Sequence, residues 1–263
     1  MRTRLLLASA AVLVGCHSRS RTDVVPTGAG SPPASGTDVL RLMHDRYDGQ
    51  WYGTLTFTQA TEIRLRGDSV VHQTWYEAAK LPGFLRIDRL AKDGRNVIIF
   101  RGDSTYVRSE GGPFAAHNHR NELMTLGFDV YRQPVERSAT ILREEGYDLA
   151  TLGEATWRGR PAWVVGAATG DTAGRPARRQ FWVDKERLVY VRSLGPGLRD
   201  STQTADIVFD AYEPLAGGWI AKEVIVSEGG TVLQREVYSD VKANVPLGDE
   251  LFDPAQIARA DAR

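Results

Sequence analysis

Few side chains in this sequence could carry out chemistry, and most of them lack the partners that catalysis requires. His117 and His119 are the only closely spaced histidines, and on a strand their rings would lie on one face. Two imidazoles could bind a metal ion, but no third histidine and no cysteine lies near them in the sequence. We therefore interpret both as loop residues and predict that there is no metal site.

Carboxylates and nucleophiles give no stronger indication of an active site. Glu144 and Glu145 are adjacent in a predicted helix, so their side chains should point in different directions instead of forming a dyad. The sequence contains no G-x-S-x-G elbow, no Walker loop and no G-x-G-x-x-G after a strand. We predict no catalytic residue, no cofactor and a protein that is not an enzyme.

Cys16 is the only cysteine and suggests a different chemistry. It follows an apolar run at residues 5–14 that is preceded by Arg2 and Arg4, which is the arrangement of a secretory signal peptide. A membrane-spanning helix needs roughly 20 apolar residues, so this run is too short to span. No second cysteine is present to form a disulfide with Cys16.

The stretch Leu13-Val14-Gly15-Cys16 resembles the lipobox of bacterial lipoproteins. The resemblance implies that residues 1–15 are removed as a signal peptide and that Cys16 receives acyl chains such as palmitate on its sulfur and amino group. The alternative is an ordinary signal peptide with an incidental cysteine. His17 stands where Gram-negative bacteria read Asp as a retention signal, which indicates export to the outer membrane.

Residues 16–36 combine the lipidated cysteine with a Pro-, Gly- and Ser-rich stretch that has no period, so we predict a flexible linker. Residues 37–263 then form a single domain. The 33 basic and 33 acidic residues balance, and no run of Lys or Arg stands out, which argues against nucleic acid as a partner. Attachment to the membrane would depend on the acyl chains.

The elements that follow are mostly strands. Thr37 and Asp38 can cap a short helix at residues 39–47, after which the apolar period changes from 3.6 to two. Two helices, around residues 122–126 and 134–146, interrupt the strands. Strands are predicted at residues 51–59, 61–66, 69–78, 83–90, 96–100, 104–109, 155–159, 161–168, 178–184, 187–194, 204–213, 218–228 and 231–243.

This pattern predicts a mainly β protein with some α structure (α+β). A sheet of this size must curl to bury one face, so we expect a curled antiparallel sheet or incomplete β-barrel, with helices filling or lidding the concave face. Two turns read Arg-Gly-Asp-Ser, at residues 66–69 and 101–104. An integrin-ligand role is the alternative, but Gly-Asp between alternating runs is also what a tight hairpin turn requires, and we favour hairpins.

Several segments resemble the periplasmic lipoprotein-carrier family, LolA and its lipidated relative LolB, diffusely over residues 38–225. The most specific are Phe57-Thr58-Gln59 and residues 82–86, PGFLR. The resemblance implies an incomplete β-barrel around a hydrophobic cavity, lidded by helices, that receives acyl chains. Leu81 stands where the family often has an arginine that helps to govern lid closure, so that mechanism is not implied here.

The leading functional hypothesis is an outer-membrane-anchored, periplasm-facing lipoprotein that binds lipid or lipoprotein acyl chains in a hydrophobic cavity, for lipoprotein sorting or lipid transport. The alternative is an envelope scaffold or stress sensor that binds a protein partner on the same fold, and the third is a hydrolase without a recognised motif. The strands carry many large apolar side chains while the filling helices are short, which predicts a gap. The candidate cavity residues are Leu55, Phe57, Phe84, Phe100, Leu123, Leu126, Ile141, Trp182, Ile207 and Phe209.

Overall fold

The structure is a computed structural model that describes residues 31–91, 94–109, 112–170 and 177–261. The predicted signal peptide, the predicted lipid attachment at Cys16 and most of the predicted linker lie outside the described residues. Residues Pro33–Arg263 form a compact unit. Its elements are α1 (Gly36–Tyr47), β1 (Thr54–Arg64), β2 (Val70–Lys80), β3 (Phe84–Ala91), β4 (Gly94–Arg101), β5 (Ser104–Arg108), β6 (Ala115–His117), α2 (Glu122–Gly127), the 3-10 helix η1 (Asp129–Tyr131), α3 (Val135–Glu144), β7 (Leu152–Trp157), β8 (Arg160–Val165), β9 (Gln180–Asp184), β10 (Tyr190–Pro196), β11 (Thr204–Leu215), β12 (Gly218–Glu228), β13 (Thr231–Ala243), the 3-10 helix η2 (Asp249–Phe252) and α4 (Pro254–Asp261).

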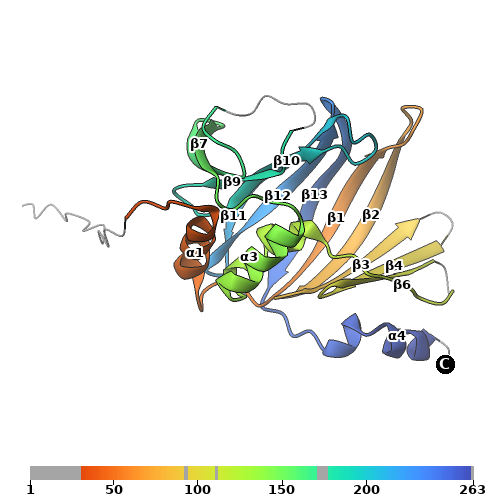
Figure 1. Cartoon of the computed structure of the whole chain (residues 1–263). Coiled ribbons are helices and arrows are strands. Elements are labelled where there is room, and N and C mark those ends of the chain that lie inside the picture. The colour runs from red at the N-terminus through yellow and green to blue at the C-terminus, as the bar shows by residue number, and fades with distance from the viewer. Residues whose placement is uncertain (1–30, 92–93, 110–111, 171–176, 262–263) are drawn as a thin grey trace, which may run out of the picture. The chain divides into compact units, whose positions relative to one another are not determined.

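One antiparallel sheet contains all 13 strands, in the order β6-β5-β4-β3-β2-β1-β13-β12-β11-β10-β9-β8-β7 (Figure 1). The chain builds outward from β1 to β6, crosses the sheet through α2 and α3, and returns from β7 to β13. The first and last strands therefore pair in the middle of the sheet, where Gln59 lies opposite Tyr238. No pairing joins β6 to β7 in the described residues, so the curled sheet stays open, and the predicted fold class is confirmed.

Most element boundaries agree with the sequence pattern, with three informative differences. The residues predicted as separate strands at 51–59 and 61–66 form one strand, β1, whose pairing with β2 is continuous from Thr54 opposite Lys80 to Arg64 opposite Val70. The helix α1 begins one turn earlier than predicted, because the Ser35 hydroxyl accepts a hydrogen bond from the Asp38 backbone N–H and caps it. The short edge strand β6 was not predicted from the sequence.

Both Arg-Gly-Asp-Ser stretches form hairpin turns, as predicted. Gly67 and Asp68, between β1 and β2, adopt φ values of 86° and 65°, and Gly102, between β4 and β5, adopts 57°. The left-handed conformation costs little at glycine, which explains its place in each turn. Asp103 also makes ion pairs that involve the helices, described below.

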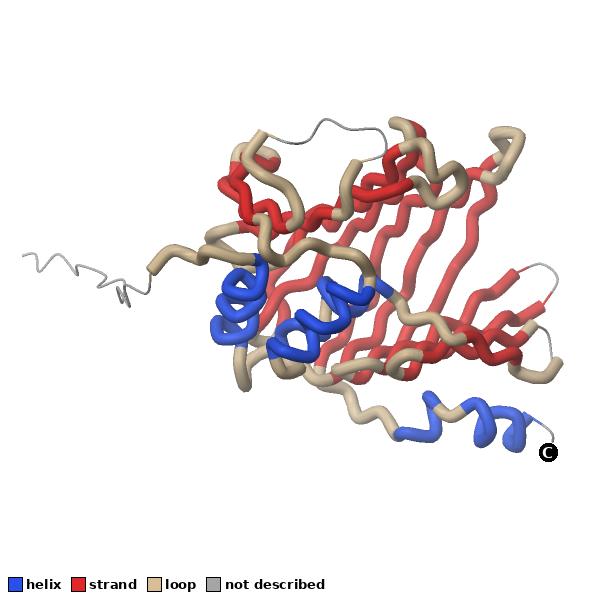
Figure 2. The backbone as a smooth tube through the Cα atoms, viewed as in Figure 1, coloured by secondary structure: helices blue, strands red, loops and turns tan. Residues whose placement is uncertain are grey.

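The helices α1 and α3 pack on one face of the sheet and fill one half of it (Figures 1 and 2). Val39, Leu40 and Met43 of α1 recur at helical spacing and are fully buried in the main core. Trp51 and Tyr131 extend this core with stacked rings whose centroids lie 3.7 Å apart. The prediction that helices cover the concave face is confirmed for this half of the sheet.

The segment after β13 covers the opposite face. Phe252 and Ile257, from η2 and α4, pack with Val97 and Ile99 of β4 in a second, smaller core cluster. The side chains of a strand alternate between the two faces, so β4 supplies both cores. No helix in the described part of the chain is long and apolar enough to cross a membrane.

Candidate binding cavity

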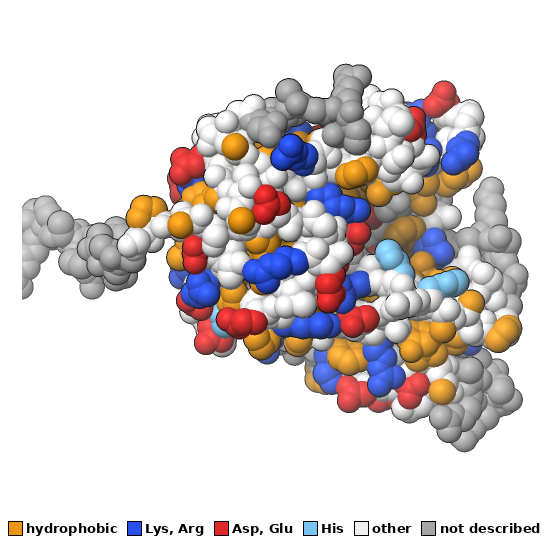
Figure 3. Space-filling model, in the orientation of Figure 1, with side chains coloured by type: hydrophobic (Ala, Val, Ile, Leu, Met, Phe, Trp, Pro, Cys, Tyr) orange, Lys and Arg blue, Asp and Glu red, His pale blue; other side chains and the backbone are white. Residues whose placement is uncertain are grey.

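A hollow of about 190 Å³ lies between α2 and the helix-bearing face of the sheet. Figure 3 shows hydrophobic side chains exposed where this face is hollowed. The helix layer leaves this half of the sheet less completely covered than the half beneath α1 and α3 (Figure 2). The lining residues are Phe57, Gln59, Trp75, Glu77, Ala79, Leu85, Ile87, Asn121, Leu123, Met124, Phe128, Phe209, Gln234, Glu236 and Tyr238. We call this space the main hollow.

Strand register explains why these side chains meet. Phe57 of β1 lies opposite Glu77 of β2, and Glu77 lies opposite Ile87 of β3, so the three share one face. On the other side of β1, Gln59 lies opposite Tyr238 of β13. The ring centroids of Phe57 and Tyr238 lie 4.4 Å apart, and both rings form part of the wall of the main hollow.

Two carboxyl groups interrupt this apolar surface. Glu236 accepts hydrogen bonds from the Tyr238 hydroxyl at 2.8 Å and from the Gln234 amide at 2.5 Å. Glu77 is only 8% exposed, and none of the described residues forms a hydrogen bond or ion pair with its carboxyl group. Burial raises the pKa of both groups, and the charge of Glu236 raises that of Glu77 further.

A second hollow of about 390 Å³ adjoins the first, and we call it the outer hollow. Asn121, Leu123 and Gln234 line both, so the start of α2 stands between them. Phe100, Leu194, Ile207 and Val226 supply apolar walls, while His119, Glu122 and Arg179 supply polar ones; the remaining lining residues are Tyr147, Ser193, Gly195, Pro196, Leu198 and Ala205. A third space of about 50 Å³ shares Phe100 and Asn121 with the outer hollow and reaches Asp129 and Ile141.

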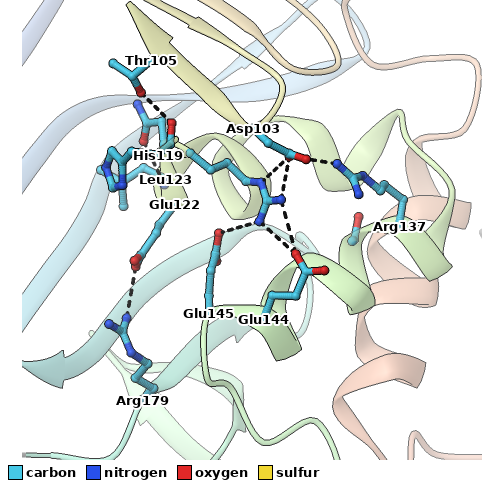
Figure 4. Close-up of polar contacts among 12 residues, drawn as sticks. Asp103, Thr105, His119, Glu122, Leu123, Arg137, Glu144, Glu145 and Arg179 are labelled. Atoms are coloured by element: carbon cyan, nitrogen blue, oxygen red, sulfur yellow. Dashed lines mark hydrogen bonds and ion pairs between the residues drawn. The ribbon is translucent and has the colours of Figure 1, made fainter. Parts of the chain in front are cut away.

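Arg120 ties the segment before α2 to the sheet and to α3. Its partners Asp103, Glu144 and Glu145 are labelled in Figure 4. Its guanidinium donates hydrogen bonds to Asp103 in the β4–β5 turn at 2.6 and 3.0 Å and lies 3.4 Å from the Glu144 carboxylate. A further ion pair of 3.6 Å joins it to Glu145. The pKa of Glu145 is raised to about 7, mainly by burial and to a smaller extent by the charge of Glu122.

Glu144 and Glu145, whose side chains were expected to point in different directions, both lie within 3.6 Å of the Arg120 guanidinium. Glu145 follows the last residue of α3, and its side chain points toward the Arg120 guanidinium. Two more contacts hold the segment in place. Thr105 donates a hydrogen bond to the His119 carbonyl at 2.6 Å, and Arg179 pairs with Glu122 at 3.1 Å.

Asp129 anchors the other end of the segment. Its carboxyl group is almost fully buried and accepts a hydrogen bond from the Gly83 backbone N–H at 3.0 Å. Burial raises the pKa of Asp129 to about 7, although that hydrogen bond opposes the rise. Leu81, which stands in place of the family's arginine, is buried in the main core.

The predicted cavity residues fall into four groups. Phe57, Leu123 and Phe209 line the main hollow, Phe100 and Ile207 line the outer hollow, and Ile141 lines the third space. The others lie elsewhere: Leu55 and Leu126 are buried in the main core, Trp182 packs against Trp157, and Phe84 packs against Phe252.

Phe84 is the clearest correction among these residues. Its neighbour Leu85 lines the main hollow, and successive strand residues point to opposite faces, so Phe84 belongs to the cluster beneath α4. The resemblance at residues 82–86 locates the strand but does not decide which of its side chains faces inward.

The polar residues of the main hollow were missed by sequence reasoning. Gln59, Glu77 and Glu236 occupy inward-facing positions of alternating strands, each two residues from an aromatic side chain of the same wall. That spacing is the sequence signal that could have placed them on the aromatic face. His117 ends strand β6, where it lies opposite Thr105, so its predicted loop position is wrong, whereas His119 lies in the loop after β6. Both side chains are exposed, and His119 borders the outer hollow. Within the described ranges no three His, Cys, Asp or Glu side chains group as metal ligands would.

Comparison with known proteins identifies the fold. No protein-family profile matches the sequence, and neither does any curated protein. Among solved structures, the chain is similar to a DUF1329 family protein from Desulfovibrio piger, with a TM-score of 0.55, 18% identity and coverage of 83% of this chain and 95% of that one. It is also similar to a LolA superfamily protein from Nitrosomonas europaea, with a TM-score of 0.54, 11% identity and coverage of 81% and 97%.

A third similar structure is a putative outer membrane lipoprotein-sorting protein domain from Vibrio parahaemolyticus. Its TM-score is 0.56 at 11% identity, with 85% of this chain and 98% of that one covered. The similarities extend over most of the 263 residues, whereas the sequences have diverged widely. The predicted resemblance to the LolA family is therefore confirmed at the level of the fold.

Proposed function

We propose that this protein binds an acyl chain of a lipid or lipoprotein in the main and outer hollows and acts as a binding protein, not an enzyme. The observation that carries the proposal is the apolar lining shared by the two hollows, which meet at Leu123. An alkyl chain leaving water for such a surface gains roughly 0.8 kcal/mol per buried methylene. The LolA-like fold supports the same function.

The position of α2 suits this function. Its Leu123 and Met124 face the main hollow, while Asn121 at its N-cap borders both hollows. A helix of six residues makes few contacts of its own, and it is held by the ion pairs around Arg120 and by Asp129. Side chains of α2 therefore form the wall that an entering chain would displace.

Binding can be tested on residues 33–263, which contain every described helix and strand and their own core. A pyrene-labelled diacylglycerol, which carries no charge, is titrated into the wild type and into Leu123→Glu. We expect saturable binding to the wild type and at least about tenfold weaker binding to the variant, because a carboxylate in the shared wall would have to be desolvated.

Leu42→Glu is the matched control, because Leu42 is an exposed leucine on α1 outside both hollows. It should bind the lipid as the wild type does. A wild type that does not bind the probe, or variants that bind equally well, would overturn the proposal. In that case an envelope scaffold or sensor that binds a protein partner becomes the working hypothesis.

We also propose that the protein is anchored through acylated Cys16 in the outer membrane and faces the periplasm. The supporting observations are the lipobox-like sequence and the fold shared with a putative outer membrane lipoprotein-sorting domain. Expressed as the full chain in a Gram-negative host, the wild type should be recovered from outer membranes with the mass of a triacylated mature chain. Cys16→Ser should lose that mass increment and the membrane fraction, and unchanged fractionation would contradict the anchor.

A further inference from the structure

The charged groups of the main hollow are all acidic. Glu77 and Glu236 line it, whereas none of its described lining residues is Lys, Arg or His. Arg89 lies near the hollow, on the same face of β3 as Ile87, but its guanidinium is placed over the Trp75 ring at 5.4 Å and is not paired with either carboxyl group. The hollow therefore presents two carboxyl groups, enclosed by apolar walls, and no cationic side chain among its described lining residues.

The two carboxyl groups are not equivalent. Glu236 already accepts hydrogen bonds from Tyr238 and Gln234. Glu77 has no such partner among the described residues, although it is more than nine-tenths buried and lines the hollow. A carboxyl group that is largely withdrawn from water and has no protein partner loses hydration, and a ligand that enters the hollow can restore a partner to it.

We propose that the main hollow binds an amphiphile with a positively charged amino group, whose ammonium pairs with Glu77 while its alkyl chain lies along the apolar wall of Phe57, Leu85 and Leu123. This inference rests on the proposed function and specifies its ligand class. An ammonium group supplies N–H donors and a compensating charge. A fatty-acid carboxylate would instead add a third acidic group to a desolvated site.

The protonation of Glu77 provides an independent signature. Burial and the nearby Glu236 raise the pKa of Glu77 in the empty hollow, so the neutral form is favoured there. A cation beside the carboxyl group favours its ionised form. Binding of an alkylammonium ion should therefore release a proton from Glu77, and binding of an uncharged alcohol should not.

The test compares three probes of equal chain length on residues 33–263: dodecylamine, dodecanol and dodecanoic acid. Isothermal titration calorimetry near neutral pH should give an affinity for the amine at least about tenfold above those for the alcohol and the acid. Repeating the amine titration in buffers of different ionisation enthalpy measures the proton release.

Glu77→Gln keeps the shape of the side chain and removes its charge. It should lose the preference for the amine and the proton release while keeping its affinity for dodecanol. Glu62→Gln is the matched control, because Glu62 lies on β1 with its side chain about half exposed and outside the main hollow. It should behave as the wild type does.

Failure of the inference can be told apart from failure of the proposed function. If the alcohol and acid bind and the amine binds no better, the ligand class is wrong while lipid binding stands. If Glu77→Gln retains the amine preference, the pairing with Glu77 is wrong. If none of the three probes binds to the wild type, both proposals are overturned, and this result needs no variant to fold.

Discussion

At the scale of single residues, the buried carboxyl of Asp129 makes stability depend on pH. It accepts the Gly83 N–H hydrogen bond, and burial raises its pKa to about 7. The native state therefore holds a proton that the unfolded chain has lost at mildly acidic pH. The stability contributed by the protonated form decreases as the pH rises from the unfolded pKa through about 7.

Asp129→Asn should remove this dependence, because an amide oxygen can accept the same hydrogen bond without ionising. We expect the free energy of unfolding of the variant to decline less between about pH 5 and pH 8, by on the order of 1 to 3 kcal/mol. Urea denaturation across this range measures it. Asp68→Asn, in the exposed β1–β2 turn, is the control, and parallel pH profiles for Asp129→Asn and the wild type would refute the assignment.

At the scale of elements, the segment from Arg120 to Tyr131 is held over the sheet by buried apolar side chains, such as Met124 and Tyr131, and by polar contacts at its start. Arg120 joins Asp103, Glu144 and Glu145, and its side chain is 17% exposed. Arg137 also reaches Asp103, at 3.0 Å, but is 45% exposed. These two arginines offer a matched pair because they share one partner and differ in burial.

Arg120→Gln should loosen α2, because the mutation removes the ion pair of the largely buried Glu145 and leaves only the more distant charge of Arg179 near it. We expect a loss of about 1 to 3 kcal/mol in the free energy of unfolding and faster hydrogen exchange in residues 120–131. Arg137→Gln removes a partly exposed ion pair and should cost less than about 1 kcal/mol. Urea denaturation measures the free energies of unfolding, and hydrogen-exchange mass spectrometry measures the protection of residues 120–131 in each variant. Equal protection of this segment in the two variants would show that the network does not hold α2.

At the scale of the whole molecule, the sheet supports a core on each face, and the main and outer hollows lie on the face that bears α2. Phe252 is fully buried where the C-terminal segment packs on β3 and β4. Its ring centroid lies 5.7 Å from that of Phe84. The residues around the hollows belong to the other face. The two faces should therefore respond separately to mutation.

Phe252→Ala should reduce the free energy of unfolding by about 3 to 5 kcal/mol, because it leaves a cavity in a small cluster. Under conditions where the variant remains folded, its affinity for the neutral pyrene-labelled lipid should equal that of the wild type. Urea denaturation and the lipid titration check the two parts. If folded Phe252→Ala bound the pyrene-labelled lipid more weakly than the wild type does, the two faces would be coupled.

The sequence by itself determined the type and the order of most elements. Strong alternation, as in residues 218–228 and 231–243, predicted strands whose bounds match β12 and β13. Gly-Asp pairs located two hairpin turns, and the apolar residues of α1 located a helix. These features depend on local backbone preferences and on periodicity, which any short window of sequence contains.

Which side chains meet was decided by the tertiary structure alone. Pairing of β1 with β13 brings residues nearly 180 positions apart onto one surface, where Gln59 lies opposite Tyr238. Alternation separates Phe84 from Leu85 but does not say which face will be concave, and residues that look solvent-facing, such as Glu77 and Glu236, lie inside. The physical reason is that burial depends on sheet curvature and on helix placement, which arise from contacts between segments distant in sequence.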